Sequence, residues 1–207
     1  MAKVIQEERE YTRKRIVEVA HIHFLRNGYE KTSLRAIAKE VGIGTSTIYG
    51  YFEKKTDLLI YTFLDLLNLQ GKQLSSYLSL WNGEMTAESL ADMITSMIMV
   101  QLQPLFRIEK PLLAQFFQAV SEELQFRELR DTMQPFGGVR EAVNHVLQQC
   151  VDAGKLKTKL ELEFLTEVLL ETSAGHIFTY IFNSDFSTEH LRLLVRQTFY
   201  VILVDKM

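Results

Sequence analysis

Apolar residues between positions 34 and 41 recur at a spacing that places them on one face only if the segment is a helix. They fall at i, i+3, i+4 and i+7, so they form a single apolar stripe on a helix. A hydroxyl side chain just before the stripe can cap the helix start, and Gly42 stands where the helix has to end. The stripe consists of Leu34, Ile37, Ala38 and Val41. The segment therefore predicts a short amphipathic helix that closes in a tight turn.

A second short helix is predicted over 45–52, where Ile48 and Phe52 are spaced for the core. Its other face carries hydroxyl and aromatic side chains between Gly44 and Gly50. The two glycines leave room for a close approach of the backbone to DNA. Two lysines, Lys54 and Lys55, follow at once. Hydroxyls suit phosphate oxygens and base edges, and lysines suit phosphates. This is the layout of a helix-turn-helix, although periodicity alone also fits an ordinary corner between two helices.

The N-terminal sixty residues resemble the TetR (tetracycline-repressor) family of bacterial regulators. The resemblance implies a homodimer that binds a palindromic operator in double-stranded DNA, usually represses, and is released by a small molecule bound in the C-terminal domain. The matching residues are Arg13, Ile16, Ala20, Phe24, Gly28, Tyr29, Thr32-Ser33, Ile37-Ala38, Gly42-Ile43, Thr47-Ile48-Tyr49, Tyr51-Phe52, Lys55 and Leu58-Leu59.

The resemblance also implies which residues contact DNA. The implied phosphate contacts are Thr32, Ser33, Thr47, Tyr51 and Lys55, and the implied base or mixed contacts are Arg35, Thr45, Ser46 and Tyr49. With Gly44, Gly50 and Lys54 these make up the predicted DNA-binding set. Four positions depart from the family pattern: Gly44 replaces a serine or threonine, Gly50 a larger residue, His23 a leucine and Ile22 a polar residue.

Charge is distributed unevenly along the 207 residues. The formal net charge is −3, but residues 1–56 carry +4 and residues 57–207 carry −7. A basic N-terminal part on an acidic body is the asymmetry expected when one end meets DNA. The single cysteine, Cys150, excludes an intramolecular disulfide and a thiolate metal cluster. No apolar leader or membrane-length apolar run is present, so we expect a cytoplasmic protein with no membrane partner.

The chain is predicted to be all-α with about nine helices. Only three prolines and ten glycines interrupt it, and few segments show the alternation of apolar and polar residues that is typical of strands. We divide it into a DNA-binding domain, 1–56, of three helices and a ligand-binding and dimerisation domain, 57–207. The expected helices span about 8–27, 34–41, 45–52, 55–77, 87–103, 109–122, 139–153, 159–182 and 188–204. Thr56 could cap the fourth of these helices and Thr86 the fifth, residues 81–83 are expected to break the chain between them, and Gly154 is expected to close the seventh.

Methionine and phenylalanine side chains in the C-terminal domain suit a cavity for an irregular apolar ligand, although each can equally fill the core. The residues chosen for a pocket are Phe63, Leu67, Met93, Met97, Phe116, Phe117, Val120 and Phe178. The last two helices are expected to form the dimer surface. The residues chosen there are Leu162, Leu165, Leu169, Ala174, Ile177, Tyr180, Ile181, Leu191, Leu194, Val195, Thr198 and Ile202.

No set of residues has the spacing of a catalytic or metal site. His21 and His23 point to different sides of a helix, and no base and orienting group accompany a nucleophile. We therefore expect no enzyme activity, no metal and no cofactor. The sequence predicts a homodimeric regulator, most simply a repressor released by an apolar or amphipathic ligand. The alternative is an all-α small-molecule carrier or enzyme that does not bind DNA.

Overall fold

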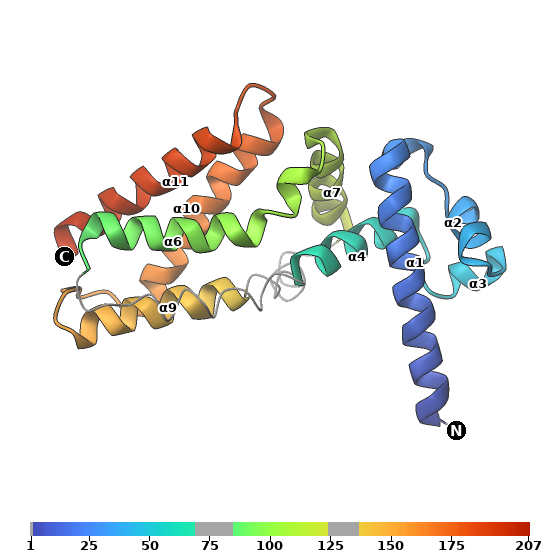
Figure 1. The fold of residues 1–207 in the computed structure, drawn as a ribbon, viewed down its shortest axis with the longest axis horizontal. Coiled ribbons are helices and arrows are strands. Elements are labelled where there is room, and N and C mark those ends of the chain that lie inside the picture. The colour runs from blue at the N-terminus through green and yellow to red at the C-terminus, as the bar shows by residue number, and fades with distance from the viewer. Residues whose placement is uncertain (1, 69–84, 124–136) are drawn as a thin grey trace. The chain divides into compact units, whose positions relative to one another are not determined.

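The computed structural model describes residues 2–68, 85–123 and 137–207, and in these ranges it is helical with no strand (Figure 1). The predicted all-α class is confirmed. No helix in this part of the chain is both long and apolar enough to cross a membrane. The helices are α1 (Ala2–Lys31), α2 (Leu34–Val41), α3 (Thr45–Tyr49), α4 (Lys55–Asn68), α6 (Ala87–Leu102), α7 (Lys110–Glu123), α9 (Gly137–Asp152), α10 (Leu162–Phe182) and α11 (Thr188–Leu203), with 3₁₀ turns at Leu105–Arg107 and Val204–Lys206.

The chain forms two compact units. Unit 1 contains residues 1–66 and 111–130, and unit 2 contains residues 67–110 and 131–207. Unit 1 therefore holds α1, α2, α3, most of α4 and nearly all of α7. Unit 2 holds α6, α9, α10 and α11. The division at residue 56 stays a prediction about domains.

The core of unit 1 is built on the stripe of α1 that contains Ile16, Ala20 and Phe24, each at most 1% exposed. α1 is longer than predicted at both ends. A kink at Gly28, with φ 73° and ψ 173°, interrupts it, and one further turn reaches Lys31. The positive φ explains why glycine stands at the kink. All four residues of the predicted α2 stripe are buried against this core.

Aromatic rings join α4 to α7 within unit 1. Phe63 of α4 stacks on Phe116 of α7, with ring centroids 4.5 Å apart and planes within 9°. Phe117 meets Phe116 edge-on at 5.1 Å. Phe63 and Phe116 are each 1% exposed, so this aromatic cluster is a packed part of the core.

Unit 2 is a helical bundle in which α11 packs on α6 and α10, and α9 packs on α10 and α6 (Figure 1). Thr86 caps α6 as predicted, through a reciprocal capping box with Ser89. Arg196 of α11 forms an ion pair with Asp92 of α6, with Nε 2.5 Å from Oδ1. That pair raises the pKa of Arg196, chiefly through the hydrogen bond to Asp92. The predicted break at 81–83 and the stretch 69–77 expected to continue α4 lie outside the described residues.

Candidate nucleic-acid interface

The start of α2 is fixed by Ser33, whose hydroxyl oxygen accepts a hydrogen bond from the Ala36 N–H at 3.2 Å. Because this bond uses an oxygen lone pair, the hydroxyl hydrogen of exposed Ser33 is still available to an acceptor such as a phosphate oxygen. α2 ends at Gly42, which has φ 83° and donates its N–H to the Ala38 carbonyl at 3.0 Å. Both predicted ends of α2 are confirmed.

The two faces of α3 separate as the sequence predicts. Ile48 is fully buried, and Phe52, just beyond the helix, is 2% exposed. Tyr49 is 52% exposed, and the rest of the outward row is exposed as well. That row consists of Gly44, Thr45, Ser46, Thr47 and Gly50. α3 itself is shorter than expected and ends at Tyr49.

Two glycines flank α3 in places where a larger residue would crowd Thr47. A Cβ at Gly44 would lie 3.3 Å from Thr47 Oγ1, and a Cβ at Gly50 would lie 3.2 Å from the Thr47 carbonyl oxygen. Both glycines have ordinary negative φ. The space they leave, rather than an unusual backbone, is therefore what glycine supplies here.

Thr32 differs from the other members of the predicted set because it is buried. It is 2% exposed, and its hydroxyl donates to the carbonyl of Gly28 at 2.8 Å, with the His23 carbonyl 3.2 Å away. The hydroxyl hydrogen is used by the carbonyl at the kink of α1, so it is committed inside the fold. Thr32 positions the start of α2 and is left out of the contacts proposed below.

The two lysines after α3 have different surroundings. Lys55 Nζ donates to the Tyr29 carbonyl at 2.8 Å and lies 4.0 Å from the centre of the Tyr29 ring. Lys54 is exposed, and its N–H donates to the Asp57 carboxylate at 3.0 Å. The Asp57 carboxylate, three residues after Lys54, therefore accepts the backbone N–H at the start of α4. The sequence suggested Thr56 for that role. Lys55 ties α4 to the end of α1 as well as carrying charge near α3.

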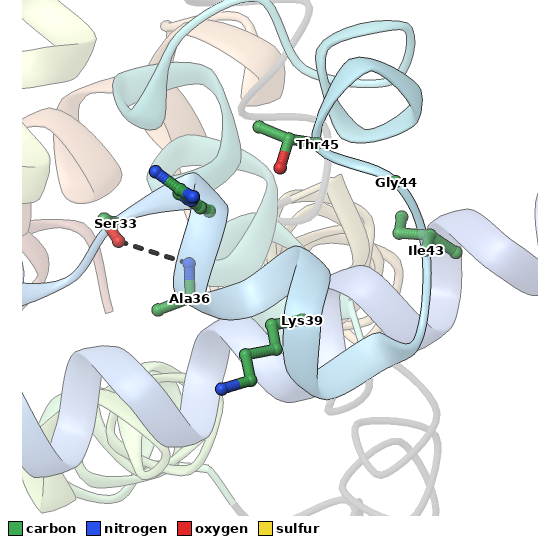
Figure 2. Close-up of a pocket in the computed structure, with 7 residues that line it drawn as sticks. Ser33, Ala36, Lys39, Ile43, Gly44 and Thr45 are labelled. Atoms are coloured by element: carbon green, nitrogen blue, oxygen red, sulfur yellow. Dashed lines mark hydrogen bonds between the residues drawn. The ribbon is translucent and has the colours of Figure 1, made fainter.

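A shallow hollow opens between the start of α2 and the start of α3 (Figure 2). Ser33, Ala36, Ile43, Gly44 and Thr45 contribute to it, together with the two exposed cationic side chains Arg35 and Lys39. Sequence reasoning missed Lys39. Its signal was the spacing of four residues from Arg35, which places both side chains on one face of a helix. The hollow thus combines two positive charges with the first residue of α3.

His23, the histidine at the unusual position in α1, faces α2. Its Nε2 lies 2.8 Å from Oε2 of Glu40, and the His23 side chain is 15% exposed. The pair connects α1 to α2 at the surface of unit 1. The substitution of a leucine by histidine is therefore accommodated by a polar partner on the neighbouring helix.

The residues predicted for a ligand pocket divide between the two units. Phe63, Phe116, Phe117 and Val120 belong to unit 1, where the three rings pack on one another. In unit 2, Met97 is buried and Met93 is half-buried. Phe178 is 47% exposed and stacks on Phe182 at 6.1 Å. The side chain of Leu67 lies outside the described residues. The pocket itself stays a prediction.

Six of the twelve dimer residues chosen from the sequence are wrong, and the other six, which are half-buried, stay a prediction: Leu162, Ala174, Ile177, Leu194, Thr198 and Ile202. Leu165, Leu169, Tyr180, Ile181, Leu191 and Val195 are at most 6% exposed, so they form the core of unit 2 and cannot present a surface. A different apolar stripe is exposed on each helix. On α10 it contains Phe164, Phe178 and Phe182, and on α11 it contains Leu193, Val201 and, just beyond its end, Val204, with exposed fractions of 40–69%.

Comparison with known proteins gives three results. The family described as "Bacterial regulatory proteins, tetR family" matches residues 16–62. An HTH-type transcriptional regulator of Staphylococcus aureus strain MRSA252 is 28% identical over 187 residues, which cover 88% of this chain and 85% of that protein. Two solved structures share the fold. Thermus thermophilus FadR, a TetR-family transcriptional repressor in complex with lauroyl-CoA, aligns with TM-score 0.66 at 17% identity over 91% of this chain and 93% of FadR. RolR in complex with resorcinol aligns with TM-score 0.60 at 17% identity over 96% and 90%.

Proposed function

Because this chain belongs to the TetR family of DNA-binding transcriptional regulators, we propose that it acts as a homodimer that represses transcription from a palindromic operator until a small apolar or amphipathic ligand releases it. The observation that carries the proposal is the exposed row of hydroxyl and aromatic side chains on α3, opposite buried Ile48. Residues 1–56 are the proposed DNA-binding domain, and residues 57–207 the ligand-binding and dimerisation domain. We place the protein in the cytoplasm, where operator DNA lies.

The proposed DNA contacts fall into two groups. Arg35, Thr45, Ser46 and Tyr49 lie at the hollow or on the outer face of α3, so they are assigned to base edges or to mixed contacts. The proposed phosphate contacts are Ser33, Thr47, Tyr51, Lys54 and Lys55, and Gly44 and Gly50 provide close approach. We add Lys39 to the proposed phosphate contacts because it lines the same hollow as Arg35.

The exposed stripes of α10 and α11 support the proposed dimer. Phe164, Val168, Glu171, Gly175, Phe178 and Phe182 are spaced by four, three, four, three and four residues along α10. This is the heptad spacing of a helix that packs against another helix. Exposed phenylalanines at both ends of the stripe favour burial against a second copy. Two copies would bring two α3 helices to successive major grooves.

Two buried hydroxyls support a ligand that carries a polar group. Thr95 of α6 and Thr166 of α10 are each 1% exposed, and their Oγ1 atoms have no hydrogen-bond partner among the described residues. Other hydroxyls in these helices, such as Ser96 and Thr172, bond to the carbonyl four residues earlier. A mostly apolar interior that contains two unsatisfied hydroxyl oxygens suits an amphipathic molecule.

The DNA-binding part is tested by fluorescence anisotropy with DNA from upstream of the protein's own gene and random DNA as competitor. Tyr49→Ala and Thr45→Ala should change the sequence preference, because both side chains are assigned to base edges. Tyr11→Ala is the matched control, since Tyr11 is an exposed tyrosine of α1 and lies about 200° around the helix from Arg9, away from the aromatic side chains that follow α3. If random DNA displaces the wild-type protein from the upstream DNA as easily as the upstream DNA itself does, the regulator proposal is contradicted.

The dimer is tested by sedimentation equilibrium. Val201→Asp should convert dimer to monomer, because it places a charge on the exposed apolar stripe of α11. Ile22→Asp is the control, since Ile22 is an exposed apolar residue of unit 1. A wild-type protein that sediments as a monomer at micromolar concentration overturns the dimer.

The ligand is tested with lauroyl-CoA, the molecule bound in the Thermus thermophilus FadR structure. If an amphipathic chain fits unit 2, lauroyl-CoA should raise the melting temperature and lower the anisotropy of the protein–DNA mixture. Lauric acid and coenzyme A alone separate the contribution of the chain from that of the head group. Release by none of the three argues against an amphipathic acyl effector.

A further inference from the structure

The buried stripe of α1 continues towards the N-terminus as two arginines. Ile16, Ala20 and Phe24 are core residues, and Arg9 and Arg13 precede them at spacings of four and three residues. These spacings keep all five side chains on one face of the helix. The face of α1 that packs on the helix-turn-helix therefore ends in cationic side chains.

Each arginine lies against an aromatic residue that follows α3. The guanidinium carbon of Arg13 is 5.8 Å from the Phe52 ring centre and 5.1 Å from that of Tyr61, and it is half-buried. The guanidinium carbon of Arg9 is 5.8 Å from the centre of the Tyr51 ring, and Arg9 is exposed. Arg13 thus lies against the buried Phe52 ring and the exposed Tyr61 ring, whereas Arg9 lies at the surface beside the end of α3.

We propose that Arg9 is a further contact to the DNA backbone, and that the Tyr51 ring is the residue that positions it. The inference rests on the proposed function, because it adds a contact to the same DNA-binding surface. A guanidinium over a ring face keeps the N–H groups along its edge free, and these groups match a phosphate in a bidentate geometry. The ring also reduces the conformational freedom that an exposed arginine loses on binding.

The neighbouring charges leave this position open. Glu8 and Glu10 flank Arg9 in the sequence, but each lies about 100° around the helix from it. Lys14 lies about 140° around the helix from Arg9 and is also exposed. Lys14 has the same charge on the same helix but a different direction, so it is a matched control.

The test measures anisotropy with the full-length protein and the upstream DNA, between 50 and 200 mM salt. R9Q should weaken binding roughly tenfold to specific and random DNA alike, because it removes one charge-assisted phosphate contact. It should also lower the slope of log K against log salt by about one unit. K14Q should change neither. If wild-type protein binds the operator and R9Q behaves like K14Q, the Arg9 contact is refuted while the proposed function stands. If the wild type shows no specific binding, the proposed function fails and this contact fails with it.

A double-mutant cycle tests the role of the Tyr51 ring. Y51F removes only the hydroxyl, so R9Q should still cost roughly tenfold in that background. Y51L removes the ring, so there the cost of R9Q should shrink to less than about threefold. An unchanged cost of R9Q in the Y51L background overturns the positioning role of Tyr51. Circular dichroism of each variant confirms that the helices remain folded.

Discussion

Lys110, which belongs to unit 2, contacts the connection between α10 and α11 in ways that a single substitution removes. Its Nζ donates to the carbonyls of Asn183 at 2.7 Å, Ser184 at 3.3 Å and Phe186 at 2.5 Å. The same ammonium lies 4.4 Å from the centre of the Tyr180 ring. Lys110→Met keeps the aliphatic stem and removes all four interactions. We expect it to destabilise the connection between the two helices.

The expected loss in the free energy of unfolding depends on which of the three carbonyls water can reach. A hydrogen bond to a charged group contributes about 1.5–3 kcal/mol, but an exposed carbonyl recovers most of this from water. Asn183 and Ser184 are exposed, whereas Phe186 is half-buried. One full contribution, from the bond to Phe186, and small ones from the other contacts give a loss of about 2–3 kcal/mol in the free energy of unfolding.

The measurement is urea unfolding at a fixed protein concentration, with hydrogen exchange of the segment 183–190 recorded in parallel. Lys155→Met is the control, because Lys155 is an exposed lysine between α9 and α10. We expect faster exchange in 183–190 for Lys110→Met alone. A loss below about 0.5 kcal/mol, the range of ordinary surface substitutions, together with unchanged exchange, would refute the reasoning.

Three further predictions concern stability. Gly42→Ala should lower the free energy of unfolding by about 1–2 kcal/mol, because φ 83° is unfavourable for alanine although no atom lies within 4 Å of the added Cβ; an unchanged melting temperature contradicts this. Thr166→Val should raise the free energy of unfolding by about 1 kcal/mol by removing an unsatisfied hydroxyl, whereas Thr62→Val, which removes a bond to the Leu58 carbonyl, should lower it by a similar amount; equal effects from urea unfolding would refute the distinction. Burial lowers the pKa of His21 below 6.5, opposed by nearby Asp65. The unfolded chain therefore binds the proton more readily, and stability should fall as the pH drops from about 6.5 through the lower folded pKa. His21→Gln should flatten that dependence, and a parallel pH profile for both proteins would contradict it.

Local physical chemistry determined most of the DNA-binding segment. The stripe of α2, the cap at Ser33, the left-handed turn at Gly42 and the burial of Ile48 each depend on residues within one or two helical turns. The same holds in unit 2, where Thr86 and Gly154, with φ 67°, mark the ends of helices as predicted. Such features follow from residue type and spacing, so sequence reasoning finds them.

The tertiary structure decided which of two equally apolar faces is the surface. α10 carries apolar residues around its circumference, such as buried Leu165 and Leu169 and exposed Phe164 and Phe178, so no single stripe distinguishes its core from a dimer interface. Thr32 and Arg9 show the same limit for polar residues. Carbonyls at the kink of α1 bury the Thr32 hydroxyl, and a ring more than forty positions away holds Arg9 at the surface. A residue's type and spacing fix the helix it forms, but its exposure depends on partners distant in the sequence, and those are known only once the helices have packed.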